Sequence, residues 1–250
     1  FLVVLASPSK QKGEGEWGSL SQDLDVQLLP IPLNQSSIKE TLKDLKPNLV
    51  LFDRFILEEQ FGHFVYEAVP DALVLLETID LHFVRRARDS VKDQFLSLTD
   101  IPKTLYQTET ALRETGSIER VDFSVVVSSF EENLLHEQFD FTKDQVAWIP
   151  FFYDEAVIEK SFAIPFQDRN SFVWIGNFRH GPNLDGLRWF RNEIWPRIRL
   201  KLPGASLKIY GAYPTKEVMQ WNQPEKNGIL VLGSVEKLET VFMNARVNLA

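Results

Sequence analysis

The chain has 250 residues, a net charge of −8 and a sequence pI near 5.1. This acidic balance argues against a dedicated nucleic-acid-binding protein, which needs a basic face for phosphates. The absence of cysteine excludes disulfides and thiolate metal sites. The sequence contains no run of about 18 apolar residues, which a membrane span would need, and it shows no signal-peptide pattern. We therefore expect a cytoplasmic protein, either free or peripheral at the membrane.

Apolar runs alternate with helical stretches in the first part of the chain. The runs predict strands at 1–6, 26–30, 48–52, 72–76, 123–128 and 145–150, and the apolar periodicity predicts helices at 38–45, 58–68, 83–96 and 106–120. Repeated strand–helix order of this kind is typical of α/β folds with largely parallel sheets and helices on both faces.

A linker predicted at 151–170 divides the chain, because that stretch contains Pro165, several charges and little periodicity. We place the two domains at 1–160 and 161–250. The second domain has predicted strands at 171–175, 206–210, 229–232 and from 247, with helices between them. Both ends of the sequence fall inside apolar runs, so we expect the second domain to be incomplete.

The stretch 171–185 predicts an anion site. A buried strand is followed by a turn at Gly176 and by a helix that we expect to start near Asn183, a favourable N-cap residue. A glycine turn before a helix N-terminus presents backbone N–H groups to one point, and phosphate is the usual ligand. Arg179 and His180 lie in this loop. The alternative is an ordinary α/β turn that binds nothing.

The first domain offers two further candidate sites. Asp80 and His82 follow the strand at 72–76, and open α/β sheets bind ligands at the carboxyl ends of their strands. The alternative is a capping aspartate and a histidine packed on the sheet. A loop after the first strand contains three glycines, which would allow close approach of a ligand: Gly13, Gly15 and Gly18. The alternative is an ordinary surface loop.

Three segments resemble motifs of retaining, family-4-type (group 1) glycosyltransferases. They are ETIDLHFVR at 77–85, VDFSVVVSSFE at 121–131 and VWIGNFRHGPNLD at 173–185, the last followed by Trp189-Phe190 and Trp195-Pro196. The third segment is the most specific. The resemblance covers most of the chain from about Asn48 onward and is weaker before it.

The resemblance implies a GT-B fold, in which two Rossmann-like doubly wound domains face a cleft. It implies an enzyme that moves a sugar from a nucleotide-sugar donor to an acceptor hydroxyl with retention of configuration, without a metal or a cofactor. The acceptor would be a glycan, a lipid-linked or a small molecule, and the pathway glycan or polysaccharide biosynthesis. Nucleic acid is not an expected partner.

The resemblance also assigns roles to particular positions. The expected donor-binding residues are Gly176, Asn177, Phe178, Arg179, His180, Gly211 and Gly233. Asp80 and His82 are the expected catalytic or acceptor-positioning pair. Gly13, Gly15 and Gly18 are expected near the donor phosphate or the acceptor. No metal ligands are expected.

Two departures from the family pattern leave alternatives open. Many relatives carry an arginine and a lysine at the positions of Asn177 and Pro182, and the family's Glu-x7-Glu segment would come after Ala250. A non-catalytic GT-B-like binding or scaffold module therefore remains one alternative. A nucleotide-sugar epimerase of the same fold is another.

Overall fold

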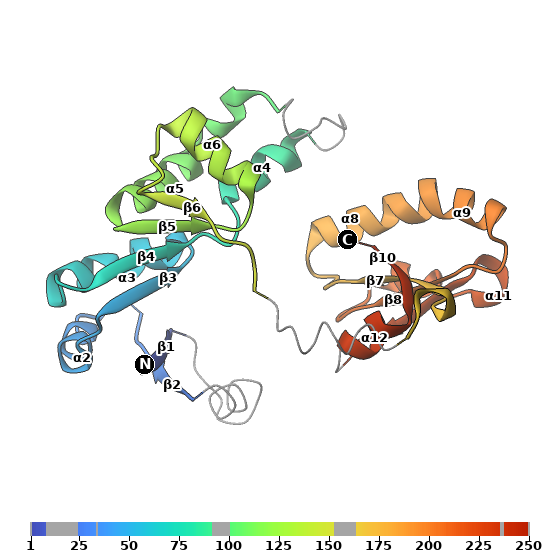
Figure 1. Ribbon diagram of the computed structural model, residues 1–250, viewed down its shortest axis with the longest axis horizontal. Coiled ribbons are helices and arrows are strands. Elements are labelled where there is room, and N and C mark those ends of the chain that lie inside the picture. Colours follow the sequence, from blue (N-terminus) through green and yellow to red (C-terminus); the bar gives the residue numbers. More distant parts are fainter. Residues whose placement is uncertain are drawn as a thin grey trace. The chain divides into compact units, whose positions relative to one another are not determined.

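The computed structural model describes residues 2–8, 25–33, 35–91, 101–152, 164–235 and 238–249. The chain forms two compact units, Phe1–Phe151 and Phe152–Ala250 (Figure 1). The predicted boundary between residues 160 and 161 lies outside the described residues. No helix in the described ranges has the length and apolar composition needed to cross a membrane.

The first unit contains two parallel sheets. A two-stranded sheet pairs β1 (Val3–Ser7) with β2 (Val26–Pro30), and a four-stranded sheet has the order β3-β4-β5-β6. The four strands are Leu49–Asp53, Leu73–Glu77, Phe123–Val126 and Val146–Trp148. The helices are α2 (Ile38–Leu45), α3 (Phe55–Ala68), α4 (His82–Val91), α5 (Glu109–Arg120) and α6 (Ser129–Phe139), with a 3-10 turn η3 (Lys103–Tyr106).

One face of the four-stranded sheet forms the core of the first unit. Leu76, Val126 and Val146 are completely buried there against helix side chains. Burial of this apolar surface stabilises the folded unit. Residues of β3 and β4 that point to the opposite face, such as Leu51, stay about half exposed. The described helices of this unit therefore pack on one side of the four-stranded sheet, and the expectation of helices on both faces is not met in this part of the chain.

The second unit has a single four-stranded parallel sheet of order β10-β7-β8-β9 (Figure 1). The strands are β7 (Ser171–Ile175), β8 (Ser206–Tyr210), β9 (Ile229–Gly233) and β10 (Ala245–Leu249). Between them lie α8 (Gly181–Trp189), a π-helical segment η5 (Phe190–Ile194), α9 (Trp195–Lys201), α10 (Lys216–Gln220), α11 (Pro224–Asn227) and α12 (Leu238–Asn244).

Helices cover both faces of the second sheet. Trp174 of β7 packs in one core with Leu187 of α8, while its neighbour Val173 packs on the other side with Val241 of α12. The chain moves from β7 to β8 and β9 and then returns to the far side of β7. This reversal makes the sheet doubly wound, and it creates a topological switch point between β7 and β10.

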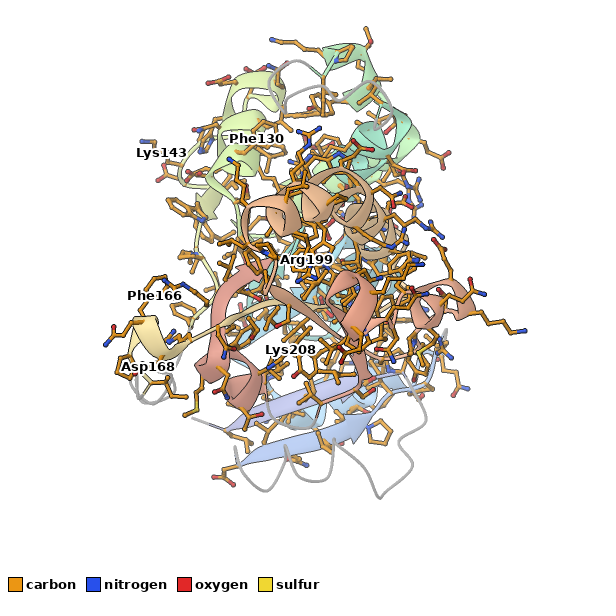
Figure 2. The ribbon with its side chains drawn as sticks, turned by 90° about the vertical axis from the view of Figure 1, so that its right-hand side faces the viewer. Phe130, Lys143, Phe166, Asp168, Arg199 and Lys208 are labelled. Carbon is orange, nitrogen blue, oxygen red and sulfur yellow. The ribbon has the colours of Figure 1, made fainter. Side chains whose placement is uncertain are left out.

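The short 3-10 turn η4 (Phe166–Asp168) leads into β7 (Figure 2). The guanidinium of Arg246 lies 4.6 Å from the centroid of the Phe166 ring. This cation–π contact connects the start of the unit to its last described strand.

Several predicted elements have the bounds expected from the sequence, namely 26–30, 38–45 and 206–210. For 106–120 the sequence predicts a helical stretch interrupted at Gly116, which is wrong, because α5 runs through Gly116 to Arg120. The stretch is divided earlier instead, where η3 ends at Tyr106 and α5 begins at Glu109. The cause is Thr108, whose hydroxyl accepts the Ala111 N–H at 3.1 Å and so caps a new helix. The predicted end of the α4 helix at residue 96 lies outside the described residues.

Candidate functional site

Three glycines meet at the carboxyl edge of the second sheet, which we call the glycine edge: Gly176, Gly211 and Gly233. The Gly211 N–H donates to the Gly233 carbonyl at 2.8 Å, and the Gly176 N–H donates to the Tyr210 carbonyl at 3.2 Å. Gly211 has a φ of +155°, and a Cβ there would lie 1.9 Å from the Gly176 carbonyl oxygen. A side chain at Gly211 is therefore excluded by the neighbouring backbone.

The loop 176–180 follows β7 at the topological switch point. Its backbone is closed by Asn177, whose Oδ1 accepts the Arg179 N–H at 2.9 Å and whose carbonyl accepts the His180 N–H at 3.1 Å. The Phe178 N–H donates to the Ala212 carbonyl at 3.1 Å. The expectation that the loop amides point at an anion therefore does not hold for Phe178, Arg179 and His180, because the protein itself occupies these three N–H groups.

The loop side chains divide into a packed and an exposed group. Phe178 is 4% exposed and lies 5.2 Å from Trp174 between ring centroids, so its side chain belongs to the core. Arg179 and His180 are exposed, and the Arg179 guanidinium lies 3.5 Å from the centroid of the Tyr213 ring. A stacked guanidinium keeps its N–H edge available to oxygen atoms. The exposed cationic side chains of Arg179 and His180 are therefore the groups of this loop that an anion could reach.

The start of α8 also differs from expectation. The helix begins at Gly181, with His180 at the N-cap and Pro182 in its first turn. Asn183 is not the cap, because its Nδ2 donates to the Asn177 carbonyl at 3.2 Å and holds the loop from inside the helix. Proline suits this first turn, since its missing N–H has no helical partner there.

At the corresponding edge of the first sheet, Asp80 and His82 lie together between β4 and α4. The Nε2 atom of His82 is 3.9 Å from Asp80 Oδ1, and Arg85 Nη1 donates to Asp80 Oδ2 at 2.8 Å. The His82 ring packs edge-on against Phe55, with the centroids 5.3 Å apart. Burial, and next the positive charge of Arg85, lower the pKa of His82, so the neutral imidazole is favoured near neutral pH.

Two buried carboxylates beneath this pair are absent from the sequence-based expectations. Glu114 is 3% exposed and accepts the N–H groups of His82 and Phe83 at 2.8 and 2.7 Å. Glu131 is 4% exposed and accepts the Leu81 N–H at 3.0 Å. Each comes from a helix far along the chain, so no local pattern reveals them.

The remaining expectations can be placed only in part. Gly13, Gly15 and Gly18 lie outside the described residues. Within the described ranges, no three His, Asp or Glu side chains gather in a way that could hold a metal ion.

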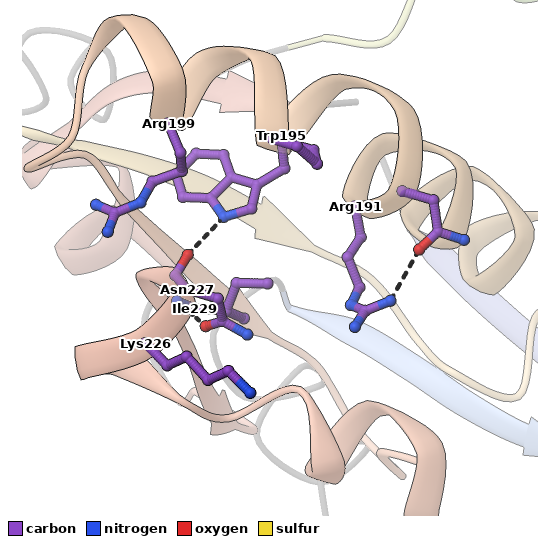
Figure 3. A pocket seen from close by; sticks show the side chains of 8 residues that line it. Arg191, Trp195, Arg199, Lys226, Asn227 and Ile229 are labelled. Atoms are coloured by element: carbon purple, nitrogen blue, oxygen red, sulfur yellow. Dashed lines mark hydrogen bonds between the residues drawn. The ribbon is translucent and has the colours of Figure 1, made fainter.

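A hollow of about 360 Å³ lies at the amino end of β9, at the edge of the sheet opposite the glycine edge (Figure 3). Arg191, Arg199 and Lys226 line it. Two of its polar side chains are bonded to the backbone: Trp195 Nε1 donates to the Asn227 carbonyl at 2.8 Å, and Arg199 donates to the carbonyls of Pro203 and Ala205. These bonds give the hollow a structural role in holding α9 to the sheet.

Comparison with known proteins adds a class to this geometry. Residues 169–250 match the sequence family described as Glycosyl transferases group 1, and this range contains the whole glycine edge. The structure is similar to a glycosyltransferase from Rickettsia africae ESF-5, with a TM-score of 0.60 and 12% identity over 98% of this chain and 63% of that chain. No curated protein matches the sequence.

A second similar structure is α,α-trehalose 6-phosphate synthase from Burkholderia multivorans, with a TM-score of 0.52 and 12% identity over 85% of this chain and 52% of that one. The chain therefore spans less than two thirds of the length of either structure. At these identities the likenesses show the fold, which is the α/β, GT-B type expected from the sequence. The fold and the domain match together support a GT-B glycosyltransferase.

Proposed function

We propose that the protein transfers a sugar from a nucleotide-sugar donor to an acceptor hydroxyl with retention of configuration. The glycine edge is the observation that carries this proposal. Three strand ends adjoin the loop of the stacked Arg179 and carry no side chain that would block the approach of a diphosphate and its sugar, and at Gly233 the space beside the backbone is open. The edge adjoins the switch point, where open α/β sheets bind their ligands.

The chemistry asked of this edge is electrostatic. The bond between the anomeric carbon and the phosphate oxygen breaks, the bond to the acceptor oxygen forms, and the acceptor proton passes to the leaving phosphate. Negative charge grows on the departing nucleoside diphosphate, where Arg179 and His180 would stabilise it. One preorganised donor of this kind contributes about 3 kcal/mol. Since the leaving group takes the proton, the proposal needs no strong protein base, and in line with the family resemblance it includes no metal ion and no cofactor.

The first unit would supply the acceptor side. Asp80 and His82 are proposed to orient the acceptor hydroxyl, and a role in the chemical step is secondary. The neutral imidazole favoured by the lowered pKa of His82 can both donate and accept a hydrogen bond, as binding of a hydroxyl requires. We propose a glycan, a lipid-linked or a small-molecule acceptor, within glycan or polysaccharide biosynthesis in the cytoplasm or at its membrane face.

A second candidate function, a non-catalytic binding or scaffold module, is favoured by one observation. Asn177 uses its side chain to close the loop at a position where many relatives carry an arginine. A scaffold of this kind has no affinity for a sugar nucleotide, so donor binding separates the two proposals.

The test is a calorimetric and thermal-shift screen of the full-length protein with UDP, GDP, ADP and their sugars. A ligand at about 100 times its Kd stabilises the folded protein by about 2.7 kcal/mol. Arg179→Ala should weaken donor binding or lower kcat/KM by roughly tenfold. Arg197→Ala, which removes an exposed arginine on α9, is the matched control. No stabilisation by any nucleotide would favour the scaffold, and equal kinetics for the two variants would remove Arg179 from the site.

A further inference from the structure

The turn that carries Asp80 and His82 has an unfavourable backbone. Ile79 has a φ of +60°, and the Asp80 N–H donates to the Thr78 carbonyl at 2.7 Å, which closes a tight turn around Ile79. A β-branched residue is rarely found at positive φ, and such conformations cost about 1–3 kcal/mol. Strain of this size persists only where the surrounding structure holds the chain in place.

The surroundings hold it through buried acceptors. The Thr78 N–H donates to the Val125 carbonyl at 3.1 Å, so the turn is attached to β5 at its start. After the turn, the Leu81 N–H donates to Glu131 and the next two N–H groups donate to the two oxygens of Glu114. The first two residues of α4 are thus held by one carboxylate from α5, where a helix most favours negative charge.

We propose that Glu114 is a positioning residue: through the His82 and Phe83 backbone N–H groups it fixes the start of α4, and thereby the orientation of the Asp80–His82 pair toward the acceptor. The assignment rests on the proposed transferase function for its catalytic consequence. The hydrogen bonds on which it depends are independent of that function.

The carboxylate form of Glu114 is the one that can accept both N–H groups. A protonated carboxyl keeps one good acceptor oxygen, while its O–H faces an N–H. Burial, opposed by the two amide hydrogen bonds, raises the pKa of Glu114 to about 7. The fraction of protein with both bonds therefore increases as the pH rises through neutrality.

Three charged groups act on Glu114 electrostatically: Asp80 before α4, Arg85 on α4 and Arg113 on α5. The elements packed around it carry further charged or titratable groups, namely His82 and Arg86 on α4, Glu58 and Glu59 on α3, Arg120 on α5 and Glu131 on α6. Arg113 and Arg120 are paired with Glu59 and Glu58 respectively. The pKa of His82 is lowered from its ordinary 6.5. This shift is opposite in direction to that of Glu114.

The experiment compares Glu114→Gln with Glu119→Gln in the full-length protein. Glu119 is an exposed residue of the same helix, so both variants lose the same charge from α5. Glutamine keeps the size of the side chain but places an NH2 group against one N–H, as the protonated acid places its O–H. Glu114→Gln should lower kcat by roughly tenfold at pH 8, leave the KM for the donor unchanged, and abolish the fall in activity near pH 7. Glu119→Gln should behave as the wild type.

Hydrogen exchange gives a readout that needs no enzymatic activity. At pH 8, after correction for intrinsic exchange, the His82 and Phe83 amides should exchange at least tenfold faster in Glu114→Gln than in Glu119→Gln. Equal exchange of these amides in the two variants, or a kcat–pH profile in Glu114→Gln that still falls near pH 7, would overturn the inference. Absence of sugar transfer in the wild type would refute the proposed function, and the exchange result would still decide the role of Glu114.

Discussion

Gly211→Ala should strongly destabilise the second unit, because two independent costs meet at this position. The backbone φ of +155° is a conformation that a residue with a Cβ rarely adopts, at a cost of about 1–3 kcal/mol. The new methyl carbon would also lie 1.9 Å from the Gly176 carbonyl oxygen and 3.0 Å from Phe178 Cε2. Relieving that overlap means moving β7 against β8, and overpacking of this kind typically costs about 1–3 kcal/mol.

Together the two terms predict a loss of about 2–6 kcal/mol in the free energy of unfolding. For a unit of about 100 residues, each kcal/mol lowers Tm by roughly 4–8 °C. The assay is urea unfolding followed by tryptophan fluorescence, since Trp174, Trp195 and Trp221 are buried in this unit.

Gly204→Ala is the matched control, because a Cβ at Gly204 would meet no atom within 4 Å. Its free energy of unfolding should stay within about 0.5 kcal/mol of that of the wild type. Equal midpoints for Gly211→Ala and Gly204→Ala would refute the close approach of the two glycine backbones. The same result would remove the structural reason for a bare glycine edge.

Three further predictions concern stability. Gly186→Ala should stabilise the second unit by about 0.5–1 kcal/mol in urea unfolding, since Gly186 lies inside α8 and its Cβ would enter open space; a loss of stability would contradict the helix. Arg120→Ala should cost about 2 kcal/mol at pH 8, because it leaves the 1% exposed Glu58 without its cation; the cost is below the 3–5 kcal/mol of a fully buried pair since Arg120 is 46% exposed. Arg120→Ala combined with Glu58→Gln should recover part of the loss. The pKa of Glu114 is about 7 in the folded protein, above its ordinary 4.5, so its contribution to the free energy of unfolding is full below about pH 4.5. That contribution is lost as the pH rises through 7, by about 3 kcal/mol in all. A difference in the free energy of unfolding between wild type and Glu114→Gln that stays constant from pH 5 to pH 8 would refute this.

The elements of the fold were accessible from the sequence where a local rule decides them. Val26–Pro30 and Ser206–Tyr210 are short stretches rich in apolar residues between polar stretches, and such stretches form strands. The separation of η3 from α5 depends on one hydroxyl, that of Thr108. The apolar periodicity of the sequence does not show where such a cap lies.

The candidate sites were accessible only in part. Strand-end glycines and the loop with Arg179 stand out in the sequence because their positions follow from the strands. The engagement of the loop amides does not stand out, because the side chain of Asn177 suits a loop closure as well as a ligand contact. Glu114 was invisible for a different reason. Its partners, His82 and Phe83, are 32 and 31 residues earlier in the sequence, and only the packing of α5 on α4 brings them together.

The position of β7 in its sheet has a consequence for synthesis of the chain. β7 is the first strand of the second sheet to leave the ribosome, yet it lies between β8 and β10, the latter being the last described strand. One edge of β7 therefore stays unpaired until roughly 70 more residues have been made, a delay of about 4–14 s at 5–20 residues per second. During that interval the strand that leads into the Gly176–His180 loop presents an open edge to other nascent chains. Protection by chaperones would act at this stage of synthesis.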